Sequence, residues 1–181
     1  MGLFDIFDKE KRARNALGRH TRKWLRKARA KDERMDEPIH WLYELGTDEA
    51  LYAMLRRYDV TIKSESMDRF EKELIHDLLV EKGEPAIPSI VRYLEDAESV
   101  TWPIKALETI TSAERVVTEI LAVLDRELEK DSFKPDKKLR MLELLRDHHD
   151  ERIPPVVVKG LTDFDETVRY SCVETLLGQD G

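Results

Sequence analysis

The sequence predicts an all-α protein whose short helices stack on one another as a solenoid. Strong helix formers (Leu, Glu, Lys, Arg and Ala) dominate the 181 residues, and only seven Gly and seven Pro are present. Short segments with apolar residues every three or four positions follow one another from residue 38 to residue 177. The segment that begins at Gly46 aligns with the one that begins at Gly83, a spacing of 37 residues. Helix-pair repeats span about 33 to 47 residues.

The first predicted element is a basic amphipathic helix over residues 2–31, within an N-terminal segment of residues 1–34. This segment carries 12 Lys and Arg against 5 Asp and Glu, whereas the remainder carries 19 against 33. Such a split suggests that the two parts meet different partners, or each other. Its apolar stripe comprises Leu3, Phe7, Ala13, Leu17, Trp24 and Ala28. Its candidate binding residues are Lys11, Arg12, Arg14, Arg19, Arg22, Lys23, Arg26 and Lys27.

Three interpretations of this basic helix remain open. It is a solvated cap that covers the first repeat, since solenoids need a terminal unit with a polar outer face. Alternatively, it lies on an anionic membrane, with Leu3, Phe4 and Phe7 as candidate membrane contacts. The third interpretation is a nucleic-acid contact through the Lys and Arg side chains.

Residues 35–181 are predicted to form the repeat region. Helices are expected over residues 38–45, 48–57, 67–81, 85–94, 101–111, 112–129, 136–146, 153–161 and 166–177. Gly46 and Gly83 mark helix ends, Ser112 is a candidate N-cap, and prolines fall in several first turns. In the helix over 67–81, we expect Phe70, Leu74, Leu78 and Leu79 to point inward. Because helices this short are marginal alone, they need to stack on their neighbours.

The C-terminal unit carries a resemblance to a known family. Leu161-Thr162-Asp163-Phe164-Asp165-Glu166-Thr167-Val168-Arg169, followed by Cys172 and Leu176, resembles the HEAT-repeat pattern, and Pro85-Ala86-Ile87-Pro88-Ser89-Ile90-Val91 looks like a matching first helix. The resemblance covers residues 35–181 and implies a right-handed, armadillo-like α-solenoid of about four to five helix pairs. It also implies a structural role for an Asp of the turn, which caps a helix or pairs with an Arg. Here these would be Asp163 or Asp165 with Arg169.

The sequence carries no motif that favours an enzyme. It has neither a glycine-rich phosphate loop nor a nucleophile motif on a sharp turn, and we expect no cofactor. The Asp147-His148-His149-Asp150-Glu151 run is interpreted as a solvated loop, with a metal or pH-sensitive role as the alternative. Trp41 and Trp102 are expected to pack, with nucleobase stacking as the alternative, and Cys172 is expected to be a buried thiol.

A solenoid implies a protein-interaction scaffold that binds another protein. The last helix is apolar on more than one side, at Val168, Cys172, Val173, Leu176 and Leu177. We therefore expect that the chain continues with another repeat, or that this face docks on a partner or on a second copy. One cysteine and no apolar run of ~20 residues favour a cytoplasmic protein, with peripheral membrane contact as the alternative.

Overall fold

A computed structural model describes residues 36–130 and 135–179. Within these residues the chain forms nine α-helices, three short 3-10 helices and no strand, so the predicted all-α class is confirmed. The basic helix predicted over residues 2–31, with all its candidate binding and membrane residues, lies outside the described residues.

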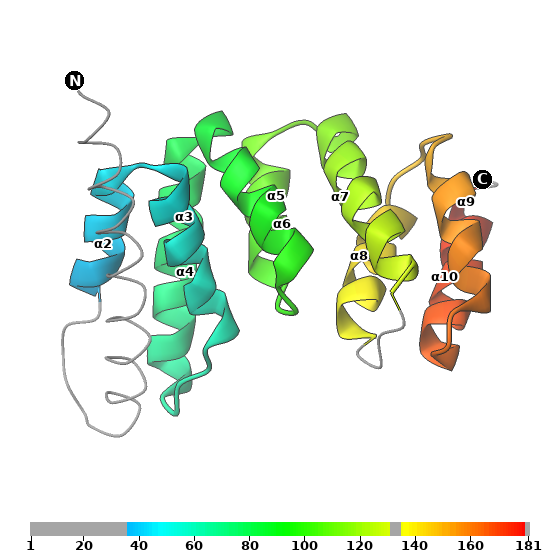
Figure 1. Cartoon of the computed structure of the whole chain (residues 1–181), viewed down its shortest axis with the longest axis horizontal. Coiled ribbons are helices and arrows are strands. Elements are labelled where there is room, and N and C mark those ends of the chain that lie inside the picture. Colours follow the sequence, from blue (N-terminus) through cyan, green and yellow to red (C-terminus); the bar gives the residue numbers. More distant parts are fainter. Residues whose placement is uncertain (1–35, 131–134, 180–181) are drawn as a thin grey trace. The chain divides into compact units, whose positions relative to one another are not determined.

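The helices follow the predicted order along the chain (Figure 1). They are α2 (Asp36–Leu45), α3 (Asp48–Leu55), η1 (Arg56–Asp59), α4 (Glu65–Lys82), η2 (Glu84–Ala86), α5 (Ile87–Asp96), α6 (Thr101–Ile110), α7 (Ala113–Leu128), α8 (Asp136–Arg146), α9 (Ile153–Val157), η3 (Val158–Thr162) and α10 (Glu166–Gln179).

The described residues divide into two compact units. Unit 1 comprises residues 36–97 and 102–110, and unit 2 comprises residues 98–101, 111–130 and 135–179. In Figure 1, α3 and α5 of unit 1 lie in front of α4 and α6, and α7 and α9 of unit 2 lie in front of α8 and α10. Contacts between α3 and α5, between α7 and α9, and between α8 and α10 hold neighbours together within each layer. Each unit is therefore a two-layered stack of helices.

The helix boundaries come from local chemistry that the sequence shows directly. Gly46 and Gly83 adopt φ values of 58° and 69° at helix ends, a conformation that glycine reaches without steric cost. The Ser112 hydroxyl accepts a hydrogen bond from Arg115 N at 3.4 Å, as expected for the N-cap of α7. The predicted helix over 153–161 is instead five α-helical residues followed by η3, whose Gly160 has a low helix propensity.

The prediction that Phe70 points inward is wrong, because its side chain is 53% exposed. The buried face of α4 is centred on Ile75, Leu78 and Leu79, and it also includes Glu71. Phe70 lies one residue before Glu71, about 100° away around the helix, and therefore falls outside this face.

A buried guanidinium fixes that orientation of α4. Arg57 is fully buried, and its Nε and Nη2 donate to Glu71 Oε2 at 2.6 Å and to Asp68 Oδ1 at 2.9 Å. Its Nη1 donates to Val60 O at 2.6 Å. Because a buried guanidinium needs carboxylate partners, α4 turns its acidic residues inward and leaves Phe70 in solvent.

Candidate interaction surface

The turn before α10 is organised by the three residues that the HEAT resemblance singles out. Asp165 Oδ1 accepts from Thr167 N at 2.8 Å and from Val168 N at 3.3 Å, so this carboxylate caps the helix. The Thr167 hydroxyl donates to the same oxygen, and these bonds hold the pKa of Asp165 below its ordinary value. The guanidinium of Arg169 donates to the backbone carbonyls of Asp163 and Phe164, at 2.9 and 3.0 Å.

The expected pairing of Arg169 with Asp163 is therefore replaced by another ion pair. Asp163 Oδ2 lies 2.6 Å from Lys138 Nζ, and the two side chains are 4% and 2% exposed. The other oxygen of Asp163 accepts from Asp165 N at 2.9 Å. Lys138 belongs to α8, so the buried pair attaches the turn to α8, and Arg169 is left to bind carbonyls.

A second buried carboxylate joins α7 to α8. Glu127 Oε1 lies 2.6 Å from Lys130 Nζ and 2.8 Å from Lys137 Nζ. Burial alone would raise the pKa of Glu127, but the two ammonium groups outweigh it and lower this pKa. The charges inside unit 2 thus serve to position α8 and α10.

The inner face of α10 is buried and partly polar. Val168 and Cys172 are fully buried, and Thr175 donates its hydroxyl to Leu142 O at 3.2 Å. A Cβ on Gly160 would overlap Cys172 Sγ, so the absence of a side chain there lets η3 approach α10 closely. Burial raises the pKa of Cys172 to about 11, which confirms the expected packed thiol.

The outer face of α10 is apolar and exposed. Tyr170, Val173 and Leu177 are 64%, 43% and 68% exposed, and their spacing (i, i+3, i+7) places them on one side of the helix. We call these three residues the α10 stripe. Of the five apolar residues predicted on this helix, Val168 and Cys172 face inward, Leu176 is half-buried, and Val173 and Leu177 face solvent. Tyr170 was not among the five, so the sequence reasoning missed this residue of the stripe.

Phe164, in the turn before α10, is also exposed, at 74%. A helix with apolar residues on both sides suits a position between two layers. Covering the remaining surface of the α10 stripe would contribute roughly 3–5 kcal/mol.

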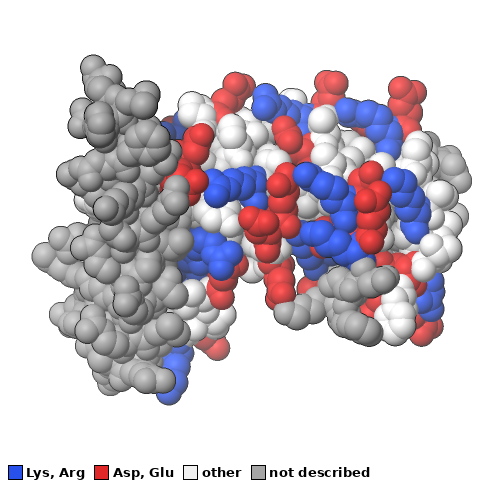
Figure 2. Space-filling model, in the orientation of Figure 1, with Lys and Arg blue, Asp and Glu red and all other residues white. Residues whose placement is uncertain are grey.

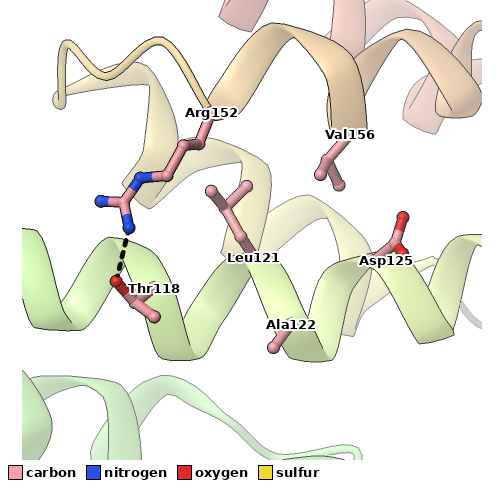
Figure 3. A pocket seen from close by; sticks show the side chains of 6 residues that line it. All are labelled: Thr118, Leu121, Ala122, Asp125, Arg152 and Val156. Carbon is pink, nitrogen blue, oxygen red and sulfur yellow. Dashed lines mark hydrogen bonds between the residues drawn. The ribbon is translucent and has the colours of Figure 1, made fainter.

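An open groove lies between α7 and α9 of unit 2 (Figure 3). Leu121, Ala122 and Val156 form its apolar lining. Arg152 crosses one end and donates to Thr118 Oγ1 at 2.8 Å, while Asp125 pairs with Lys159 at the other end. These polar groups already bind one another, so the groove offers a ligand little beyond a shallow apolar lining.

Two further candidates from the sequence, Asp150 and Trp102, make structural contacts. The Nε of Arg152 donates a hydrogen bond to Asp150 Oδ1 at 2.8 Å. Hydrogen bonds from Arg152 lower the pKa of Asp150 to about 2. In the described part of the chain, no three His, Cys, Asp or Glu side chains gather as a metal site, the 147–151 run included. Trp102 stacks on Tyr58 with ring centroids 6.3 Å apart, which confirms packing for this residue.

On the face that Figure 2 shows, acidic and basic side chains of the described residues are interspersed with uncharged ones. Among residues 36–130 and 135–179, no helix has both the length and the apolar character that crossing a membrane requires.

Comparisons with protein-family models, with curated proteins and with solved structures found no match. The functional inference therefore depends on the residues themselves.

Proposed function

We propose that this chain is a non-enzymatic interaction scaffold that binds a partner protein through the α10 stripe. The single observation that carries this proposal is the two-sided character of α10, whose inner face is buried while Tyr170, Val173 and Leu177 stay exposed. Contiguous exposed apolar surface on a folded protein is typical of interaction sites.

The chemistry of the stripe favours a protein as the partner. Tyrosine is enriched among the residues that dominate binding at protein interfaces, and the two aliphatic side chains beside it add apolar area that excludes water. Glu166 is exposed and Glu174 and Arg169 are partly exposed on the same helix, and they supply a charged rim. A nucleic acid would instead require a cluster of cations that α10 does not carry.

The finer architecture is part of the proposal. A HEAT-like, right-handed solenoid of four to five helix pairs is supported by the two-layered stacking within each unit and by the Asp165 cap. The 37-residue repeat supports it as well, because the aligned pairs Ala50 with Ile87 and Ala53 with Ile90 are all buried where α3 meets α5. A cytoplasmic location belongs to the same proposal and is supported by the single, buried cysteine.

Affinity capture with the full chain tests the binding role. A Val173→Glu/Leu177→Glu variant places two charges in the stripe, and a Thr109→Glu/Ala113→Glu variant places the same charge at exposed positions elsewhere. We expect the control to retain the proteins that the wild-type chain captures and the stripe variant to lose them. The stripe has no binding role if both variants, each with an unchanged unfolding midpoint, capture the same proteins. Sedimentation of the wild-type chain alone shows whether the partner is a second copy.

A second function is favoured by the charge of residues 1–34, which carry 12 basic and 5 acidic side chains. This segment would bind an anionic membrane or a nucleic acid. Titration of DNA and of anionic liposomes at several salt concentrations tests it. With roughly six phosphate contacts, the log–log salt slope for DNA would be about −5. A flat salt response would eliminate the nucleic-acid role, and absence of liposome binding would eliminate the membrane role.

A further inference from the structure

One side of α4 in unit 1 is apolar at its beginning and acidic at its end. Met67, Phe70, Leu74, Asp77 and Glu81 recur at helical spacing, and we call them the α4 stripe. Phe70 is 53% exposed, and Met67 and Leu74 are half-buried. The Asp77 side chain is 78% exposed, and Glu81 is exposed. This side lies away from the face that buries Ile75 and Leu79.

In the described part of unit 1, no Lys or Arg side chain forms an ion pair with the acidic end of this stripe. Asp77 contacts the ring of His76 at 3.0 Å, and Glu81 approaches the Tyr43 hydroxyl of α2 and raises its pKa, after the larger effect of burial. The nearby cations are used elsewhere, since Arg69 pairs with Glu73 and Lys72 pairs with Asp68. The stripe therefore suits a ligand that combines an apolar surface with positive charge.

Residues 1–34 have this composition and the right length. The predicted helix places Ala13, Leu17, Trp24 and Ala28 on one stripe among Arg and Lys residues. At 1.5 Å per residue, residues 13–28 extend over about 22 Å and the α4 stripe over about 21 Å. The apolar stripe of the basic helix and the α4 stripe therefore have similar lengths. The two segments also carry opposite charges, so their apolar and charged side chains can pair.

The connection to α2 delivers this segment to the α4 stripe of its own chain. The helix α2 begins at Asp36 and contacts α4, where Lys82 Nζ lies 5.1 Å from the centre of the Tyr43 ring. Four residues, 32–35, separate the end of the predicted basic helix from α2, and the five steps from residue 31 to residue 36 reach up to roughly 17 Å. A short tether gives an effective concentration of about millimolar, which favours binding within one chain over binding between chains.

We propose that the α4 stripe is the docking surface for the basic helix of residues 2–31 of the same chain. Docking covers Phe70 and places the arginines of the helix beside Asp77 and Glu81. The remaining cations of the docked helix face outward, so one segment both closes the end of unit 1 and presents a basic surface.

Photo-crosslinking in the full chain tests this proposal. p-Benzoylphenylalanine replaces Phe70 in one sample and Phe164 of unit 2, which is more exposed, in the control, and mass spectrometry locates the cross-links. We expect position 70 to cross-link to residues 1–34 within a single chain and position 164 not to do so. Cross-links from position 70 that appear only in dimers would assign the stripe to a second copy. Absence of any cross-link to residues 1–34 would equally overturn the proposal.

A charge test is combined with the same label at position 70. Asp77→Lys/Glu81→Lys removes the acidic end of the stripe, and Glu129→Lys/Glu151→Lys makes the same net change at exposed positions of unit 2. Losing two exposed ion pairs should reduce the cross-link yield about fivefold in the first variant. An equal yield in both variants, with circular dichroism unchanged, would contradict the electrostatic complementarity.

Discussion

The buried pair of Lys138 and Asp163 gives the sharpest prediction about stability. The two side chains are 2% and 4% exposed, with Nζ and Oδ2 2.6 Å apart. In Lys138→Ala the Asp163 carboxylate stays buried without its cation. Removing one partner of a buried pair typically costs about 3–5 kcal/mol. For a chain of this size, that loss corresponds to a decrease of roughly 6–20 °C in the unfolding midpoint.

Two further variants separate the ion pair from other effects of the substitution. Lys159→Ala removes a cation from an exposed pair with Asp125, and we expect it to leave the unfolding midpoint unchanged. Lys138→Met/Asp163→Asn removes both charges but keeps an oxygen that can accept from Asp165 N. We expect this double variant to recover most of the lost stability, because replacing both partners of a buried pair is often neutral.

Thermal unfolding followed by circular dichroism at neutral pH provides the measurement. The reasoning would be refuted if Lys138→Ala unfolded at the same temperature as Lys159→Ala. It would also be refuted if the double variant were less stable than Lys138→Ala.

Three other predictions follow from the same unit. Gly160→Ala should destabilise the chain by about 1–3 kcal/mol in urea unfolding, because the new methyl group overlaps Cys172 Sγ, and adding Cys172→Ala should relieve part of that cost. The Cys172 thiol, with its pKa raised to about 11, should react with a thiol reagent at pH 8 only after unfolding, and rapid labelling of the native chain would be inconsistent with its burial. The pKa of Glu127 is lower in the folded chain, so its contribution is present above the ordinary value of 4.5 and is lost as the pH falls through the lowered value. Glu127→Gln should therefore flatten the stability profile below about pH 4.5, and a profile parallel to wild type would contradict this.

Much of the helical framework could be predicted from the sequence because local chemistry decides it. Gly46, Gly83 and Ser112 act on the few residues beside them, and the helix over 136–146 was predicted with the bounds that α8 has. The predicted helix over 153–161 was too long because the low helix propensity of Gly160 was not weighed, and the close approach of Gly160 to Cys172 of α10 could not be predicted from either segment alone.

The exposed apolar residues of α10 and α4 could be predicted only in part, because contacts between segments distant in sequence decide which face of a helix is buried. Val173 and Leu177 could be recognised because Val168 and Cys172 already provide the apolar residues of the buried face of this helix. Phe70 was predicted inward because apolar residues usually are, but the buried Arg57 decides how α4 is oriented. Likewise, Asp163 pairs with Lys138, 25 positions away, and no local pattern announces such a partner.

The proposal that the α10 stripe binds a partner protein is tested most directly by measuring the affinity of a captured partner for the chain. Isothermal titration compares the wild-type chain with Val173→Glu/Leu177→Glu. Loss of apolar burial and desolvation of two carboxylates should cost at least ~3 kcal/mol, which is about a hundredfold in Kd. We expect that increase in Kd with an unchanged unfolding midpoint, since Val173 and Leu177 are exposed in the chain alone. An unchanged Kd would contradict the claim that this face of α10 binds the partner.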